Sequence, residues 1–199
     1  MEKIAERIVV WQIQKNVIKE EDKAVYVYAY ETLLMRVINF LIAIIAGVAT
    51  KNLLAVIVFL VSYIPLRTYA GGYHSRDSIR CMIFSTLLIL GVALITKIPL
   101  YEKSPFGFFV FVGIGILSYA VILFVSPVAD ENKPLSEEEK RQYAVKARMI
   151  ATVIIIAAFI FLFIEKPGIG GVLLLVQVIM ACMLLLGIAN NRRLKKKTS

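Results

Sequence analysis

The stretch Pro105–Pro127, PFGFFVFVGIGILSYAVILFVSP, decides the fold of this 199-residue chain. It holds no charged residue, and it is long enough for a helix that crosses a bilayer, which needs about 17–25 apolar residues. The whole chain is 59% hydrophobic with a mean hydropathy of +0.78, whereas soluble domains have roughly 45–50% apolar residues. The sequence therefore predicts an all-α, polytopic membrane protein.

Five further apolar segments lie around this stretch, and together they predict about six transmembrane helices. The last segment is also of comfortable length. The second is short and ends at a proline-containing sequence, so a re-entrant or strongly kinked element would look the same. The six segments are Leu33–Thr50, Leu53–Leu66, Cys81–Ile98, Pro105–Pro127, Met149–Ile164 and Gly168–Asn190.

Lysine and arginine are unevenly distributed between the two sides of this arrangement. If both termini lie inside, the termini and the loops Arg67–Arg80 and Val128–Arg148 hold 18 of the 23 basic residues. The outer connections hold 4, and Arg36 lies in the first span. Because basic residues are retained on the cytoplasmic side, we expect a multi-pass protein with cytoplasmic N- and C-termini. The net charge of +9 then reflects membrane topology and not binding of nucleic acid.

Three regions follow from these patterns. Residues 1–30 predict an amphipathic helix before the spans, residues 31–190 a six-span membrane domain, and residues 191–199 a basic cytoplasmic tail. Two arrangements explain the amphipathic pattern of the first helix equally well. The helix lies in the membrane interface, or it packs against a neighbouring subunit. Such a helix, together with Gly113-Ile114-Gly115 in the fourth span, could support a homodimer. The residues at helical spacing in the first region are Ile4, Ile8, Trp11, Lys15 and Ile18.

The loop after the second segment reads RTYAGGYHSRDSIRC over Arg67–Cys81. It contains the only histidine of the chain, His74, and one of its two cysteines, Cys81. A thiol and an imidazole are the minimal parts for covalent acyl transfer, because the cysteine attacks as a thiolate and the histidine accepts its proton. The loop 67–81 is therefore the candidate catalytic site.

This pair cannot act from one straight helix, where residues seven apart are separated by roughly 10 Å. Proton transfer needs about 2.6–3.2 Å between heavy atoms. Gly71-Gly72 interrupts the helix and places His74 on a loop. Cys81 then falls in the first turns of a new helix, where the helix dipole and a neighbouring arginine favour the thiolate. The candidates for the N-cap of this helix are Ser75, Asp77 and Ser78.

Other interpretations remain open from the residues alone. An interfacial histidine and a packed cysteine would look the same, and so would a small transporter, a channel or a sensor subunit. The transporter interpretation is weakened because the spans hold almost no ionisable residue beyond Arg36 and Lys97. A metal site is weaker still, since one histidine, one cysteine and Asp77 fall short of the four ligands of structural zinc.

We expect Cys182, in the last apolar segment, to be buried. In the loop before the fifth segment, Ser136 and Glu139 predict a capping box.

The chain resembles the accessory gene regulator B (AgrB) family of quorum-sensing membrane peptidases. Arg67, Gly72, His74 and Cys81 match the signature of that family, an arginine, then Gly-x-His, then a cysteine after six further residues. The loop Ser126–Leu135 resembles the proline-containing loop between the fourth and fifth spans of the family. The likeness runs from the N-terminal helix to the basic tail.

The resemblance implies a cysteine endopeptidase of the bacterial cell membrane. Its relatives cut a short AgrD-like precursor peptide on the cytoplasmic face and promote its cyclisation to a thiolactone or lactone autoinducing peptide. Cys81 matches the nucleophile and His74 its partner base. Arg67 and Gly72 are supporting positions: we expect Arg67 to orient a carboxylate or the loop, and Gly72 to supply a backbone bend. No metal and no cofactor is implied. Basic residues that would suit an acidic tail of the precursor are Arg141, Lys146 and Arg148.

Overall fold

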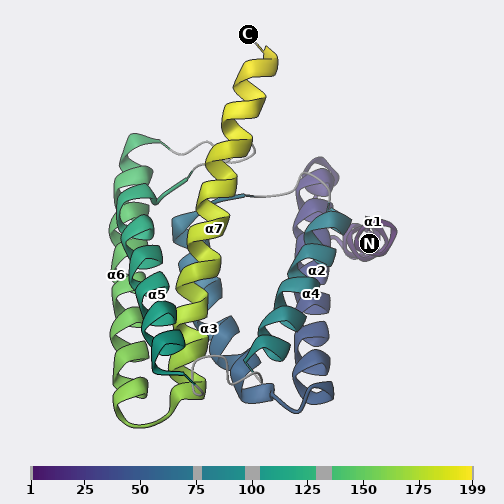
Figure 1. Cartoon of the computed structure of the whole chain (residues 1–199). Coiled ribbons are helices and arrows are strands. Elements are labelled where there is room, and N and C mark those ends of the chain that lie inside the picture. Colours follow the sequence, from purple (N-terminus) through teal and green to yellow (C-terminus); the bar gives the residue numbers. More distant parts are fainter. Residues whose placement is uncertain (1, 74–77, 97–103, 129–135, 199) are drawn as a thin grey trace.

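The computed structural model describes residues 2–73, 78–96, 104–128 and 136–198, and of residues 78–81 and 194–198 it describes the backbone only. The described chain forms seven α-helices and one short 3-10 helix, which confirms the all-α prediction (Figure 1). The elements are α1 (Glu2–Gln14), η1 (Glu20–Asp22), α2 (Lys23–Ala49), α3 (Leu53–Ala70), α4 (Ser78–Ile95), α5 (Pro105–Val125), α6 (Glu137–Phe163) and α7 (Pro167–Thr198).

In the described part of the chain, five helices are long and apolar enough to cross a membrane, which confirms a polytopic membrane protein. They are α2, α3, α5, α6 and α7, and the apolar part described for α4, Met82–Ile95, is shorter. Within the described residues, each of the six predicted apolar segments falls almost entirely on one of the helices α2 to α7. The second segment, which was ambiguous in the sequence, forms a helix of 18 residues that continues through Pro65 to Ala70. A proline removes one backbone donor, whereas ending the helix in apolar surroundings would leave several groups unpaired.

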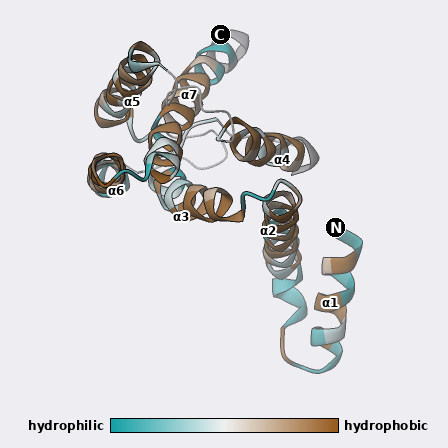
Figure 2. Ribbon diagram, turned by 60° about the horizontal axis from the view of Figure 1, so that its bottom comes forward, coloured by the Kyte–Doolittle hydropathy of each residue, from teal (hydrophilic) through white to brown (hydrophobic). Residues whose placement is uncertain are grey.

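Helix α7 is the centre of the molecule. It packs against α3, α5 and α6, while α2 and α4 lie together on the other side of α3 (Figures 1 and 2). Of the α7 span 56% is buried, against 17–28% for the other four. Figure 2 shows hydrophobic residues along the surrounding helices, and many of their large apolar side chains are exposed, as expected when the outer solvent is lipid.

Small residues permit the close packing of α5 on α7. A Cβ atom added at Gly115 would lie 2.8 Å from the Leu174 side chain, so this glycine lies in the contact between α5 and α7 of the same chain. A Cβ at Gly113 would meet nothing within 4 Å. Of the two glycines that could have supported a dimer, only Gly113 therefore faces outward.

The N-terminal helix α1 packs on the first half of α2, at the edge of the molecule (Figure 2). Ala5 and Val9 are buried in this contact, and Gln12 Nε2 donates to Tyr30 Oη at 2.7 Å. Ile4 and Trp11 remain 50% and 58% exposed on the neighbouring face. The predicted helical pattern to Ile18 is too long, because α1 ends at Gln14 and the chain turns at Asn16 with φ +55°.

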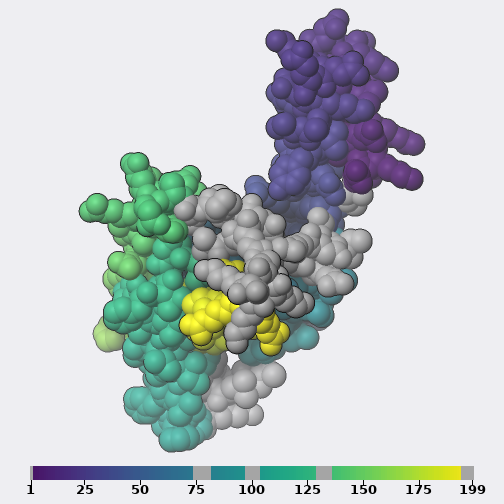
Figure 3. Space-filling model, turned by 90° about the horizontal axis from the view of Figure 1, so that it is seen from above, coloured from purple at the N-terminus to yellow at the C-terminus, as the bar shows by residue number. Residues whose placement is uncertain are grey.

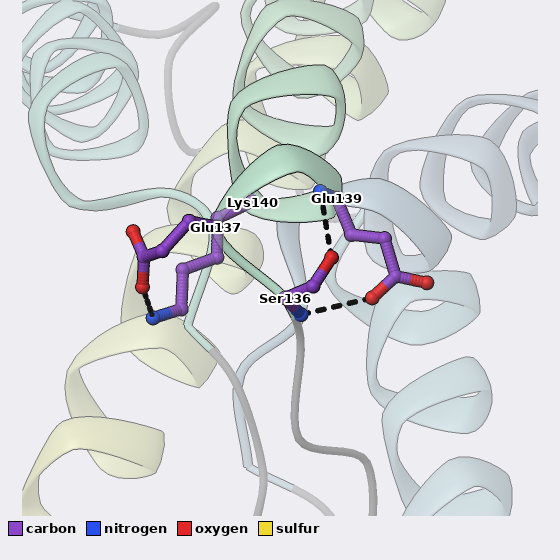
Figure 4. A network of polar contacts seen from close by, with 4 residues as sticks. All are labelled: Ser136, Glu137, Glu139 and Lys140. Carbon is purple, nitrogen blue, oxygen red and sulfur yellow. Dashed lines mark hydrogen bonds and ion pairs between the residues drawn. The ribbon is translucent and has the colours of Figure 1, made fainter.

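Helix α6 begins in the polar loop, well before its apolar segment. Ser136 Oγ accepts from Glu139 N at 3.2 Å, and Ser136 N donates to Glu139 Oε2 at 2.9 Å (Figure 4). This confirms the predicted capping box, which satisfies two backbone donors of the first turn. The cap places the polar first turns of α6 beside the end of α3.

Candidate functional site

The end of α3 continues into a short extended segment, Gly71–Tyr73, which we call the strap. Gly71 caps α3 at φ +73° and Gly72 follows at φ +103°, a backbone region that favours glycine. Gly72 N donates to Val128 O at 3.2 Å, and Val128 N donates to Ala70 O at 3.0 Å. This parallel bridge joins the strap to the segment that follows α5.

The strap also lies against α7. Tyr73 N donates to Met183 O at 3.0 Å, although that carbonyl belongs to a helix. Gly187, one turn further along, is buried, and a Cβ atom there would lie 2.8 Å from Tyr73 N and 2.9 Å from Gly72 C. The backbone of the strap thus touches the backbone of α7.

Arg67 holds the strap from the third side. Its Nη1 donates to Gly71 O and its Nη2 donates to Tyr73 O, and the side chain is half-buried. A guanidinium group presents its donors in a fixed fork, so one side chain can bind two carbonyls at once. Of the two functions considered for Arg67, orienting a carboxylate or the loop, the structure shows contact with the loop.

Gly72 is enclosed between this arginine and α7. A Cβ atom at this position would lie 2.7 Å from Arg67 Nη1 and 2.8 Å from Met183 O. Any side chain at this position would therefore force the strap away from Arg67 or from α7. The positive φ of Gly72 agrees with the expected backbone bend.

The predicted catalytic pair is described only in part. His74 follows directly after the strap and lies outside the described residues, as does Asp77. Helix α4 begins at Ser78, so the backbone of Cys81 lies in its first turn, as predicted. The structure does not describe the side chain of Cys81.

The three basic residues expected to bind the precursor do not share one face of α6. Lys146 lies toward α3, with its Nζ 5.1 Å from the centre of the Tyr69 ring. Tyr69 also packs edge-on against Tyr143, with ring centres 5.5 Å apart. Arg141 and Arg148, seven residues apart, lie together on another face, because a helix turns by about 100° per residue. All three are exposed, and Lys146 is next to the helix that carries the strap.

The expectation that Cys182 is buried is wrong, because its side chain is exposed. It lies on the face of α7 that turns away from the packed helices, together with Leu185 and Leu186. In a membrane protein an apolar segment carries residues on its lipid-facing side as well as in its core, so hydrophobic surroundings in sequence do not predict burial.

Sequence reasoning missed three residues that build the site: Val128, Met183 and Gly187. The first two act through their backbone atoms, which leave no trace in the residue type. Gly187 gave the one available signal, since an isolated glycine inside a helix often has a packing reason.

These observations define a class of protein: a helical, multi-span membrane protein in which an arginine and α7 hold a glycine strap ahead of a histidine, at one end of the molecule. Figure 3 shows that end, with α5 and α6 in green on one side, α1 and α2 in purple on the other, and α7 in yellow between them. The chain belongs to the accessory gene regulator B family, which it matches over residues 1–189.

Individual relatives are similar at a lower level. The chain is 29% identical over 148 residues to the putative AgrB-like protein 2 of Clostridium perfringens, covering 73% of this chain and 66% of the relative. It is 27% identical over 157 residues to a putative AgrB-like protein of Lactiplantibacillus plantarum, covering 78% and 76%. The matched region thus spans just under two thirds of the Clostridium protein. No solved structure matches the chain.

Proposed function

We propose that this protein is a membrane-embedded cysteine endopeptidase that processes a short AgrD-like precursor peptide for quorum sensing. Membership of the AgrB family supports this function. The observation that carries the proposal is the strap. Arg67 and Gly72 belong to one hydrogen-bonded unit that ends immediately before His74, and Cys81 lies in the first turn of the next helix. All four signature residues lie within the stretch Arg67–Cys81 of the sequence, and hydrogen bonds hold the part of this stretch that precedes His74.

In the proposed first step, the Cys81 thiolate attacks the scissile carbonyl of the precursor and a carbon–sulfur bond forms. The carbon–nitrogen bond then breaks, and His74 gives a proton to the departing amine. The start of α4 supports the nucleophile, since the positive end of a helix dipole favours a thiolate. The product of this step is a thioester between Cys81 and the remaining peptide.

In the second step, a thiol or hydroxyl group of the same peptide attacks the thioester. His74 accepts the proton of this group, and Cys81 leaves as a thiolate, so a thiolactone or lactone ring closes without ATP. Ring closure competes with hydrolysis, and a site among membrane helices supports it by limiting the access of water.

The active site faces the cytoplasm in this proposal. The strap, the start of α4 and the start of α6 lie at the end of the molecule to which α7 carries the C-terminus (Figure 1). The loops and termini at this end hold most of the basic residues, which are retained on the cytoplasmic side.

The acidic tail of the precursor binds to the basic residues of α6 in this proposal. Lys146 is the first candidate, because it contacts Tyr69 of α3. Tyr69 follows Arg67 by two residues in the same helix. Arg141 and Arg148 would bind a different part of the peptide, since they lie on another face.

Co-expression with an AgrD-like precursor peptide tests the proposal, with the peptide followed by mass spectrometry. Wild type should cleave the precursor, while Cys81→Ala and His74→Ala should lose cleavage at equal membrane levels. In the same assay, Lys146→Ala should raise the precursor concentration needed for half-maximal cleavage, whereas unchanged dependence would remove this residue from the binding site. Cleavage that survives Cys81→Ala would end the thiolate mechanism and favour a transporter or a sensor subunit.

A further inference from the structure

We infer that α7 sets the position of the strap, and that Gly187 is a positioning residue for peptide cleavage. The inference rests on the proposed function and extends it to a helix that carries none of the signature residues. Met183 supplies a backbone carbonyl that binds the strap, and Gly187 supplies the space in which the strap lies.

Gly187 differs from Gly168 and Gly170 of the same helix in what it touches. A Cβ atom at Gly168 would meet nothing within 4 Å, and one at Gly170 would first meet the flexible Leu162 side chain. The three atoms nearest to a Cβ at Gly187 are all backbone atoms: Tyr73 N at 2.8 Å, Gly72 C at 2.9 Å and Gly72 Cα at 3.0 Å. Backbone atoms cannot rotate away as a side chain does, so the strap itself would have to move.

The strap has little room to move without losing its other contacts. On its far side the bridge with Val128 is so close that a Cβ atom at Gly71 would overlap the Val128 carbonyl. A shift away from α7 would also lengthen the bond from Tyr73 N to Met183 O, which is 3.0 Å long. Displacement at Gly187 therefore passes along the strap to its end at Tyr73, and the next residue in the chain is His74.

The expected effect is on the chemical step. A misplacement of about 1 Å in a catalytic group can cost on the order of 100-fold in rate. We expect Gly187→Ala to lower kcat for precursor cleavage by about 10- to 100-fold and to leave KM nearly unchanged. Gly168→Ala is the matched control, because it adds the same methyl group to the same helix in open space.

A second readout separates positioning from a general loss of structure. In a Cys182→Ser background, which removes the exposed second thiol, the rate at which iodoacetamide alkylates Cys81 is measured against pH. The profile of Gly187→Ala should shift toward that of His74→Ala. In a chain that already carries His74→Ala, adding Gly187→Ala should change the profile no further.

A third variant keeps the inference testable if Gly187→Ala does not reach wild-type levels in the membrane. Replacing Tyr73 by its α-hydroxy acid analogue removes the N–H that binds Met183 O and adds no volume to α7. This variant should also lower kcat by a larger factor than the factor by which it changes KM. Equal kcat values for Gly187→Ala and Gly168→Ala would overturn the inference, provided that wild-type cleavage depends on Cys81. Wild-type cleavage independent of Cys81 would instead overturn the proposed function.

Discussion

At the scale of single residues, the shape of the Arg67 side chain matters as much as its charge. Its two terminal nitrogens bind the carbonyls of Gly71 and Tyr73, at the two ends of the strap. Those carbonyls follow the end of a helix, where backbone acceptors lack partners within the helix. One forked cation thereby fixes both the end of α3 and the direction in which the chain leaves it.

Arg67→Lys should lower precursor cleavage by at least about tenfold, although it keeps the charge. Lysine is a point donor and does not bridge two carbonyls in a fixed geometry, and one hydrogen bond to a charged group contributes about 1.5–3 kcal/mol. Cleavage rates by mass spectrometry at matched membrane levels measure the effect.

Arg193→Lys, at an exposed position near the end of α7, is the control for this exchange and should leave the rate unchanged. If Arg67→Lys cleaved as fast as wild type, charge alone would be sufficient at this position, and the two-carbonyl interpretation would be wrong.

How far the site could be predicted from sequence differs from residue to residue. His74 and Cys81 are rare residue types in this chain, and the break at Gly71-Gly72 has a local cause, so these features could be found. The contacts of Arg67 could not, because its partners are backbone carbonyls. Val128 and Met183 were missed for the same reason, since long-range backbone contacts impose no side-chain pattern on the sequence.

At the scale of elements, α1 presents two different faces. Ala5 and Val9 pack on α2, while Ile4 and Trp11 are exposed. If the exposed face lies in the membrane interface, brominated lipids should quench the fluorescence of Trp11 strongly. Trp11 is the only tryptophan of the chain, so the signal reports on α1 alone.

Acrylamide, a water-soluble quencher, supplies the comparison on the same residue. Strong quenching by brominated lipid and weak quenching by acrylamide support the interface. Weak quenching by both would mean that another protein surface covers Trp11, which is the neighbouring-subunit interpretation of the same pattern.

The ends of the helices could be predicted from the sequence where a local signal marks them. The capping box at Ser136 and Glu139 identified the start of α6, because it depends on residues three apart. The end of α1 at Gln14 and the start of α2 at Lys23 were not found. The apolar pattern continues to Ile18, and α2 begins with polar turns ahead of its apolar segment, so hydrophobicity alone placed both boundaries wrongly.

At the scale of the whole molecule, the alternating helices α2 to α7 predict which loops share a side. In a Cys81→Ser, Cys182→Ser background, a cysteine at Lys166, between α6 and α7, should react with an impermeant maleimide on intact cells. A cysteine at Glu138, in the first turn of α6, should react only after the membrane is opened. Both positions are exposed, so accessibility reports the side of the membrane.

The reverse labelling pattern would place the strap outside the cell and would contradict cleavage of a cytoplasmic precursor. Labelling of both cysteines on intact cells would show instead that the two loops share a side, contrary to the predicted span count.

The contact between the strap and α7 also has a consequence for biosynthesis. The strap is made early, but its partners at Val128 and Gly187 are translated much later. A nascent chain that has inserted α3 and α4 already carries both His74 and Cys81, yet it lacks the helix on which the strap lies. For the proposed peptidase, maturation should therefore depend on insertion of α7, so ribosome stalling or truncation upstream of α7 should release only inactive thiol-bearing fragments.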